Sequence, residues 1–377
     1  MFFVPSYLTA EGSFTSGIEG AVVDSNGIPY ACDSSTMESA NLARIDPVSG
    51  AVEVVFEFPP GGGCVGGRFR EPFEGEYAGL KGERSKGKRN LLLMNNIAPA
   101  LVLKASHAMS LWSDLLLTDY KHHTLISVDT TSPASGAWSG KTVLQGAFTQ
   151  PNDLAMTPNG RFVFLSDPDF LASRGRIWRA EWDPRSGAFM NLQVVAEEGL
   201  TTANGIEVID HPRSQGGNGW TLVASESKAQ LIRRWTIDEV SGDLSTPQVL
   251  LNMSTAIPPF DFDGMRATTD GVLYVTMNAG GGRVLAVTYA GSILCEIDAL
   301  GLGPSNIAFG GNDGRTAFVT QVKGGRMVQF RVPAEGSSFA RMHQRPSWNQ
   351  ETLASRGQRK WMDCRTKVDQ IYSKQVA

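Results

Sequence analysis

Four oxygen-bearing side chains stand at equivalent places in a repeated sequence pattern: Glu19, Asn152, Asn204 and Asp263. Each comes just before a short alternating run that predicts a β-strand. Two carboxylates and two carboxamides, without sulfur or imidazole, form a ligand set for one hard divalent cation. Calcium suits this set best, and Zn²⁺, Mg²⁺ or Mn²⁺ are the alternatives. A single Asn or Asp before a strand is usually a turn residue, but Glu19 is a poor turn former.

The repeat that carries these residues is most complete in PNDLAMTPNGRFVFLSD, residues 151–167. Its Asn-Gly pair predicts a tight turn between two antiparallel strands, because both residues tolerate positive φ. Similar stretches occur five more times, and the six anchor positions are Glu19, Val65, Asn152, Asn204, Asp263 and Ser305. Four of the five spacings lie near the roughly 40–50 residues of one propeller blade. The sequence therefore predicts an all-β fold, a six-bladed β-propeller.

The propeller is expected to occupy residues 1–340, with an atypical insertion at 71–113, and residues 341–377 are expected to form a C-terminal tail. Residues up to Gly17 are expected to supply an outer strand to the last blade, which closes the ring. The insertion is interpreted as a partly disordered surface segment, a lid over the channel, or translated intron sequence. Blades related by rotation bring equivalent positions to the axis, so the four oxygen-bearing residues should meet there.

Composition excludes some partners and suggests a location. The 377 residues carry a formal net charge of -4, so no basic field exists to attract nucleic acid. No run of about 18 apolar residues occurs, which argues against a membrane span. The N-terminus lacks the features of a secretory signal, and a cytoplasmic protein is expected. The four cysteines are scattered and are expected to be reduced. The oligomeric state stays open.

The loops that follow the second strand of each blade should surround the candidate metal site. These loops are residues 33–41, 119–124, 167–175, 226–230, 278–282 and 322–325. They contain His122, His123 and Arg174, which join Asn152 as candidates for substrate binding. The alternative is that the histidines are exposed loop residues and that Arg174 is a solvated loop charge.

Several stretches together resemble the SMP-30/gluconolactonase/LRE-like family of regucalcin-like six-bladed propellers, which includes diisopropylfluorophosphatase-like enzymes. They are IEGAVVD, PNDLAMTPNGRFVFLSDP, ANGIEV, FDGMRATTDGVLYVT and PSNIAFGGNDGRTAFVT. The resemblance implies that Glu19, Asn204 and Asp263 bind calcium or another divalent ion. It implies that Asn152 binds the metal or touches the substrate. It also implies hydrolysis of sugar lactones.

A divalent ion at the channel mouth can polarise a lactone carbonyl and stabilise the oxyanion that forms when water attacks. Asp263 and Glu19 are the catalytic candidates, because either carboxylate could accept the proton of the water. The favoured hypothesis is a gluconolactonase-like hydrolase acting on a small sugar lactone. The alternatives are an esterase or phosphotriesterase, another enzyme of specialised metabolism, and a non-enzymatic calcium-binding propeller.

Overall fold

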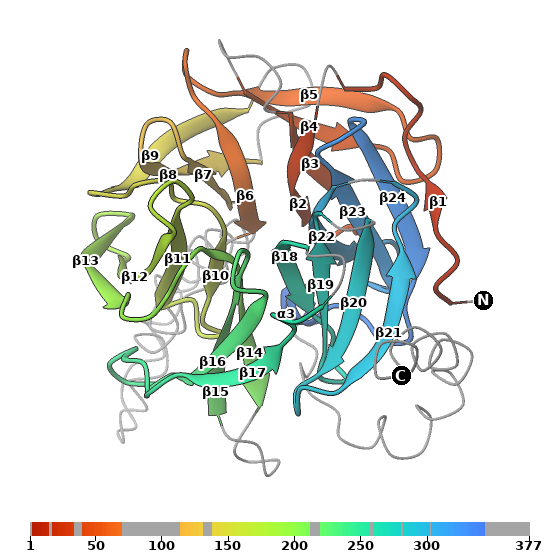
Figure 1. The fold of residues 1–377 in the computed structure, drawn as a ribbon. Coiled ribbons are helices and arrows are strands. Elements are labelled where there is room, and N and C mark those ends of the chain that lie inside the picture. Colours follow the sequence, from red (N-terminus) through yellow and green to blue (C-terminus); the bar gives the residue numbers. More distant parts are fainter. Residues whose placement is uncertain are drawn as a thin grey trace, which may run out of the picture.

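The alternating runs of the sequence fold into β-strands, which assemble into six antiparallel sheets of four strands each. The computed structural model describes residues 2–14, 17–33, 40–69, 114–130, 138–211, 219–256, 260–279, 282–301 and 303–343. The expected insertion at 71–113, and the expected tail from residue 344 onward, lie outside the described residues. The six sheets surround a common axis, as a six-bladed propeller requires (Figure 1).

The sheets follow one another along the chain. The first contains β2 (Ile18–Val23), β3 (Pro29–Asp33), β4 (Asn41–Ile45) and β5 (Val52–Glu57). The second contains β6 (Cys64–Phe69), β7 (Asp114–Asp119), β8 (Thr124–Asp129) and β9 (Ser139–Gln145). The third contains β10 (Leu154–Met156), β11 (Phe162–Asp169), β12 (Arg174–Asp183) and β13 (Ala188–Ala196). The fourth contains β14 (Ala203–His211), β15 (Gly219–Glu226), β16 (Leu231–Thr236) and β17 (Gln248–Asn252). The fifth contains β18 (Phe262–Ala267), β19 (Val272–Met277), β20 (Arg283–Thr288) and β21 (Ile293–Asp298).

The sixth sheet closes the ring. It combines β22 (Pro304–Gly310), β23 (Thr316–Gln321) and β24 (Arg326–Arg331) with β1 (Ser6–Tyr7) from the other end of the chain. Ser6 pairs with Gln329 in an antiparallel register. The prediction that an N-terminal segment supplies the outer strand of the last blade is therefore confirmed.

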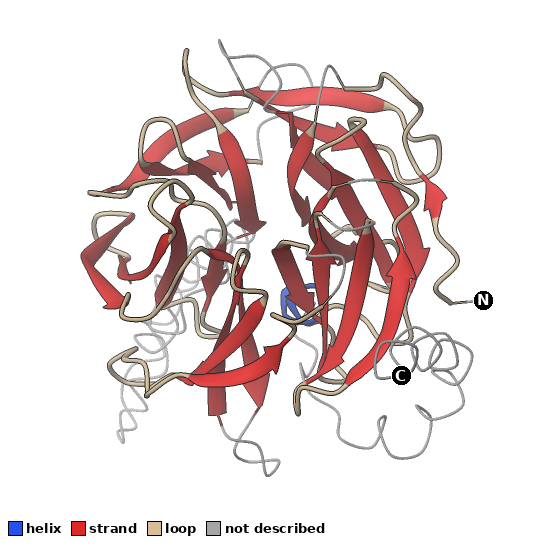
Figure 2. Ribbon diagram, viewed as in Figure 1, coloured by secondary structure: helices blue, strands red, loops and turns tan. Residues whose placement is uncertain are grey.

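The predicted Asn-Gly hairpin of residues 151–167 also forms. Leu154 pairs with Leu165, and Gly160 adopts a φ of 69°, which a glycine tolerates without strain. Apolar side chains of neighbouring sheets pack between the blades. For example, the rings of Tyr274 and Phe309 meet edge to face with centroids 5.2 Å apart. The described part of the chain adds one short α-helix, α3 (Ser337–Met342), and is otherwise strands and loops (Figure 2).

The prediction of reduced cysteines is wrong for Cys32 and Cys64, which form a disulfide. The bond joins β3 of the first sheet to the start of β6 in the second, with the two Cα atoms 5.6 Å apart. The cysteines are 32 positions apart, and only the packing of two blades brings them together. Disulfides persist mainly in oxidising compartments and are rare in the cytosol, so this bond counts against the cytoplasmic location, which remains a prediction.

Among the described residues, no helix is long and apolar enough to cross a membrane.

Candidate functional site

A β-bulge lies beside the anchor position in most of the inner strands. In β2 the pairing register shifts between Glu19 and Val22, and β14 and β18 shift in the same way beside Asn204 and Asp263. The inner strands β6 and β22 carry the corresponding irregularity near their first residues. A bulge re-aims a side chain out of the regular ladder. The repeated bulges therefore explain why these residues leave the sheet faces at the same end of the propeller.

Glycines directly after two of the anchors let the inner strands approach closely. A Cβ added at Gly205 would lie 2.2 Å from the carbonyl oxygen of Asp263 in the next blade. A Cβ added at Gly264 would lie 2.5 Å from the side chain of Asn306. Contacts this short leave no room for any side chain. The two glycines therefore keep the candidate residues close to one axis.

The four predicted metal ligands line one cavity of about 270 Å³. The full lining consists of Glu19, Val65, Gln150, Asn152, Phe170, Asn204, Ser227, Lys228, Asp261, Asp263 and Asn278. Five of the six anchor positions of the repeat thus share this cavity. The sixth anchor, Ser305, is buried and hydrogen-bonds to the Glu19 side chain.

Glu19 and Asp263, the two carboxylates among the candidate ligands, strongly disfavour being charged together. Burial, with smaller contributions from the charges of Asp153 and Asp261, raises the pKa of Asp263 to about 7. Asn278 Nδ2 donates a hydrogen bond of 2.6 Å to Asp263 Oδ2 and opposes this rise. Burial, followed by the charge of Asp263, also raises the pKa of Glu19 well above its ordinary value. A bound cation would relieve this repulsion and favour both charged forms.

The amide of Asn204 is held with its oxygen free. Its Nδ2 donates to Ser227 Oγ at 3.0 Å, and that hydroxyl donates in turn to the Phe262 carbonyl oxygen at 2.6 Å. Asn204 Oδ1 is buried and has no hydrogen-bond partner. An unpartnered buried acceptor costs about 1–3 kcal/mol, which a ligand at that atom would recover.

The donor set fits a hard divalent cation, since every candidate ligand atom is an oxygen of a carboxylate or an amide. Within the described residues, no group of three or more His, Cys, Asp or Glu side chains is placed to hold a metal. A cation in this cavity would therefore depend on Asn152 and Asn204 as well as on the two carboxylates.

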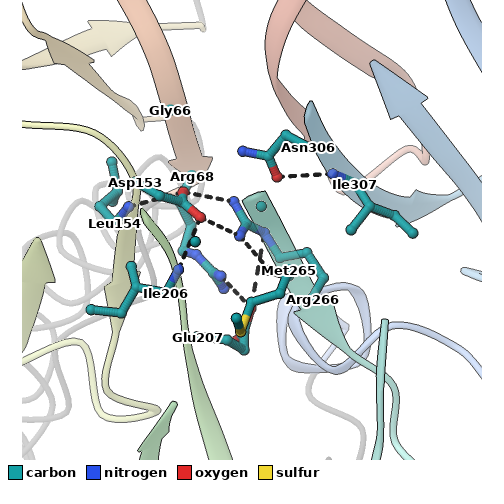
Figure 3. Close-up of polar contacts among 12 residues, drawn as sticks. Gly66, Arg68, Asp153, Leu154, Ile206, Glu207, Met265, Arg266, Asn306 and Ile307 are labelled. Carbon is teal, nitrogen blue, oxygen red and sulfur yellow. Dashed lines mark hydrogen bonds and ion pairs between the residues drawn. The ribbon is translucent and has the colours of Figure 1, made fainter. Parts of the chain in front are cut away.

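A second tier of charged residues, Arg68, Asp153, Glu207 and Arg266, is buried near the propeller axis (Figure 3). Arg266 donates to both oxygens of Asp153, at 2.8 and 3.0 Å, and Arg68 donates to Glu207 at 2.6 Å. The side chains of Asp153 and Glu207 are each only 1% exposed. Arg68, Glu207 and Arg266 each follow an anchor by three positions, which corresponds to about 10 Å along a strand. This second tier was not predicted from the sequence, although the constant spacing from the anchors could have indicated that these charged residues lie together.

The other predicted substrate-binding residues lie elsewhere. His122 Nδ1 is 2.8 Å from Asp119 Oδ2, and His123 has a φ of 57° in the same loop. Arg174 pairs with Asp169 at 3.3 Å and lines a separate cavity of about 320 Å³. None of these three residues lines the cavity that holds the candidate ligands. Their role in substrate binding stays a prediction.

Three of the six predicted pocket loops contribute side chains to the cavity. Phe170 comes from loop 167–175, Lys228 from loop 226–230 and Asn278 from loop 278–282. The repeat predicts that these loops lie beside the anchors, but Lys228 and Asn278 were not predicted as site residues. Asp261 and Gln150, just before the anchors of their own blades, were also missed.

Comparisons with known proteins agree with this architecture. The sequence model described as "SMP-30/Gluconolactonase/LRE-like region" matches residues 37–323. The match includes Asn152, Asn204 and Asp263 and begins after Glu19. No curated protein sequence matches the chain.

Several solved structures share the fold at low identity. A luciferin-regenerating enzyme has a TM-score of 0.60 and 12% identity, over 88% of this chain and 97% of its own. A regucalcin from Agrobacterium tumefaciens, described as a calcium-binding protein, has a TM-score of 0.58 and 15% identity, with coverages of 89% and 95%. A gluconolactonase from Xanthomonas campestris has a TM-score of 0.56 and 16% identity, with coverages of 87% and 89%. At these identities the likeness establishes the fold alone.

Proposed function

The chain belongs to the SMP-30/gluconolactonase/LRE-like family, and we propose that it is a divalent-cation-dependent lactonase that opens a small sugar-type lactone by attack of water. The observation that carries this proposal is the unpartnered, buried Asn204 Oδ1 in the same cavity as Glu19, Asn152 and Asp263. A relative described as a gluconolactonase and one described as calcium-binding support the reaction and the choice of calcium.

The cation would be held by Glu19, Asn152, Asn204 and Asp263, and Asn152 would also touch the substrate. When bound, the cation supplies Lewis acidity toward the lactone carbonyl. The protein prepares the ligands: Asn278 orients the Asp263 carboxylate, and Ser227 fixes the Asn204 amide. Preorganised groups of this kind avoid the cost of rearranging during the reaction.

The protein also has to accept a proton from the attacking water. Asp263 is one candidate base, because its carboxylate lines the cavity, and burial opposes the lowering of its pKa that a bound cation would cause. Glu19 is the other candidate, and its pKa is also raised, first by burial. Either carboxylate could later return the proton to the alkoxide that leaves when the ring opens.

A lactone panel with metal removal and restoration tests this proposal. Purified protein is assayed on sugar lactones, aryl esters and phosphotriesters, before and after EDTA, and then with calcium or other divalent ions added back. Lactone hydrolysis that disappears with EDTA and returns with a divalent ion is expected. Preference for an ester or a phosphotriester would instead indicate the related hydrolase activities.

Variants of two candidate ligands complete the test. Asp263→Ala and Asn204→Ala are expected to abolish turnover while the far-ultraviolet circular dichroism of the propeller is preserved. Asp313→Ala removes a half-exposed carboxylate that does not line the cavity and is the matched control. Full, EDTA-resistant activity in both site variants would refute the mechanism.

A further inference from the structure

Lys228 brings a positive charge to a cavity that is otherwise acidic. The charged residues of the lining are Glu19, Asp261 and Asp263 on the negative side and Lys228 on the positive side. Lys228 directly follows Ser227, the residue that fixes the Asn204 amide. Lys228 therefore lines the same cavity as the candidate cation site.

The lysine side chain is held in a defined position by neutral groups. Its Nζ donates to the carbonyl oxygen of Phe170, which also lines the cavity, and lies 3.4 Å from Ser173 Oγ. Its backbone N–H donates to Thr202 Oγ1 at 3.0 Å. These contacts span two neighbouring blades and leave the ammonium with remaining hydrogen-bonding capacity, since a lysine has three donors.

The charge of Lys228 is not neutralised by an ion pair among the described residues. The carboxylates nearest in sequence and on the facing loop have other partners. Glu226 pairs with Arg233, and Asp169 pairs with Arg174. The Lys228 ammonium is thus positioned beside the cavity with its charge still available to a ligand.

The charge balance of the cavity indicates what that ligand carries. A divalent cation would offset two of the three carboxylate charges of the lining, and Lys228 would offset the third. With Lys228 present, an anionic group can enter without net repulsion and gain a charge-assisted hydrogen bond. Without it, the cavity would repel the same group.

We propose that Lys228 binds an anionic substituent of the substrate, so that the cavity selects lactones carrying a carboxylate or a phosphate group. The inference rests on the lactonase function proposed above and adds the substrate class to it. Lys228 acts on specificity, and the reacting carbonyl is handled by the anchor residues.

Kinetics on matched lactones tests the inference with the full chain loaded with calcium. The substrates are gluconolactone, which is neutral, glucarolactone, which adds a carboxylate, and gluconolactone phosphorylated at its terminal hydroxyl. Lys228→Met is expected to raise KM roughly 10- to 100-fold for the anionic lactones with little change in kcat, and to leave the neutral lactone nearly unaffected. The anionic lactone with the larger rise in KM shows whether carboxylate or phosphate is the preferred group.

Two variants separate charge from structure. Lys228→Arg keeps the charge and should retain the preference for anionic lactones. Lys121→Met removes a lysine from the corresponding loop of the second blade, outside the cavity lining, and should have no effect. An equal effect of Lys228→Met on all three lactones would mean that the lysine only braces the loop at Phe170, and would overturn the inference.

Binding measurements distinguish failure of this inference from failure of the proposed lactonase. Calorimetry compares glucarate with gluconate, which differ by one carboxylate, on calcium-loaded protein. Tighter binding of glucarate to the wild type than to Lys228→Met supports the inference even if no lactone is hydrolysed. Identical glucarate affinities for the two proteins would refute it, whatever the outcome of the activity assays.

Discussion

The buried pair of Arg266 and Asp153 allows a quantitative test of the second tier. Its bonds of 2.8 and 3.0 Å join two side chains that are only 7% and 1% exposed. Arg266→Met would leave the Asp153 carboxylate buried without its cation, at a cost of about 3–5 kcal/mol in the free energy of unfolding. That is a large share of the roughly 5–15 kcal/mol that stabilises a typical native protein. Urea unfolding followed by tryptophan fluorescence measures the loss.

A double variant identifies the cause of that loss. Asp153→Asn removes the charge but keeps an acceptor for the Ile206 N–H, so Arg266→Met with Asp153→Asn should be more stable than Arg266→Met alone. Arg331→Met is the control, because it breaks a similar pair with Asp313 at the surface and should cost at most about 1 kcal/mol. The reasoning would be refuted if Arg266→Met lowered the free energy of unfolding no more than Arg331→Met does. It would also be refuted if the double variant were less stable than Arg266→Met alone.

Two further predictions concern the disulfide and the pH dependence of cation binding. The Cys32–Cys64 bond closes a loop of 32 positions, so its reduction should lower the free energy of unfolding by roughly 3–4 kcal/mol. Thermal unfolding with and without a reductant checks this, and an unchanged melting temperature would contradict it. Burial raises the pKa of Asp263 to about 7, so the metal-free carboxyl holds its proton below that pH and must lose it to bind a cation. Calorimetry should show calcium affinity falling at least about tenfold per pH unit below about 7, since the pKa of the second carboxylate ligand, Glu19, is raised as well. A calcium affinity that does not change between pH 8 and pH 5 would contradict this competition.

The propeller was predictable because its information is local and repeated. The Asn-Gly hairpin of residues 151–167 specifies its own turn, and similar stretches recur at nearly the length of a blade. Rotational symmetry then brings equivalent anchors to one end of the axis. This is why Glu19, Asn152, Asn204 and Asp263 could be grouped from the sequence before any side chain was placed.

What escaped prediction depends on contacts between blades. Arg68, Glu207 and Arg266 are charged residues inside strands, and local patterns place such residues at the surface. Their burial follows from pairing across the axis, as in the 2.6 Å contact between Arg68 and Glu207. Nothing in the spacing of Cys32 and Cys64 indicates that two blades bring them together either. Lys228 was hidden for a related reason, since its position depends on a carbonyl group of the neighbouring blade.

The pairing of β1 with β24 has a consequence for how the molecule is made. Ser6 is synthesised long before its partner Gln329. During translation the early blades therefore exist as an open arc, and the sixth sheet lacks its fourth strand until the segment around Ser6 returns. Assembly of the complete ring is thus a late, long-range event, of the kind that slows the folding of β-proteins.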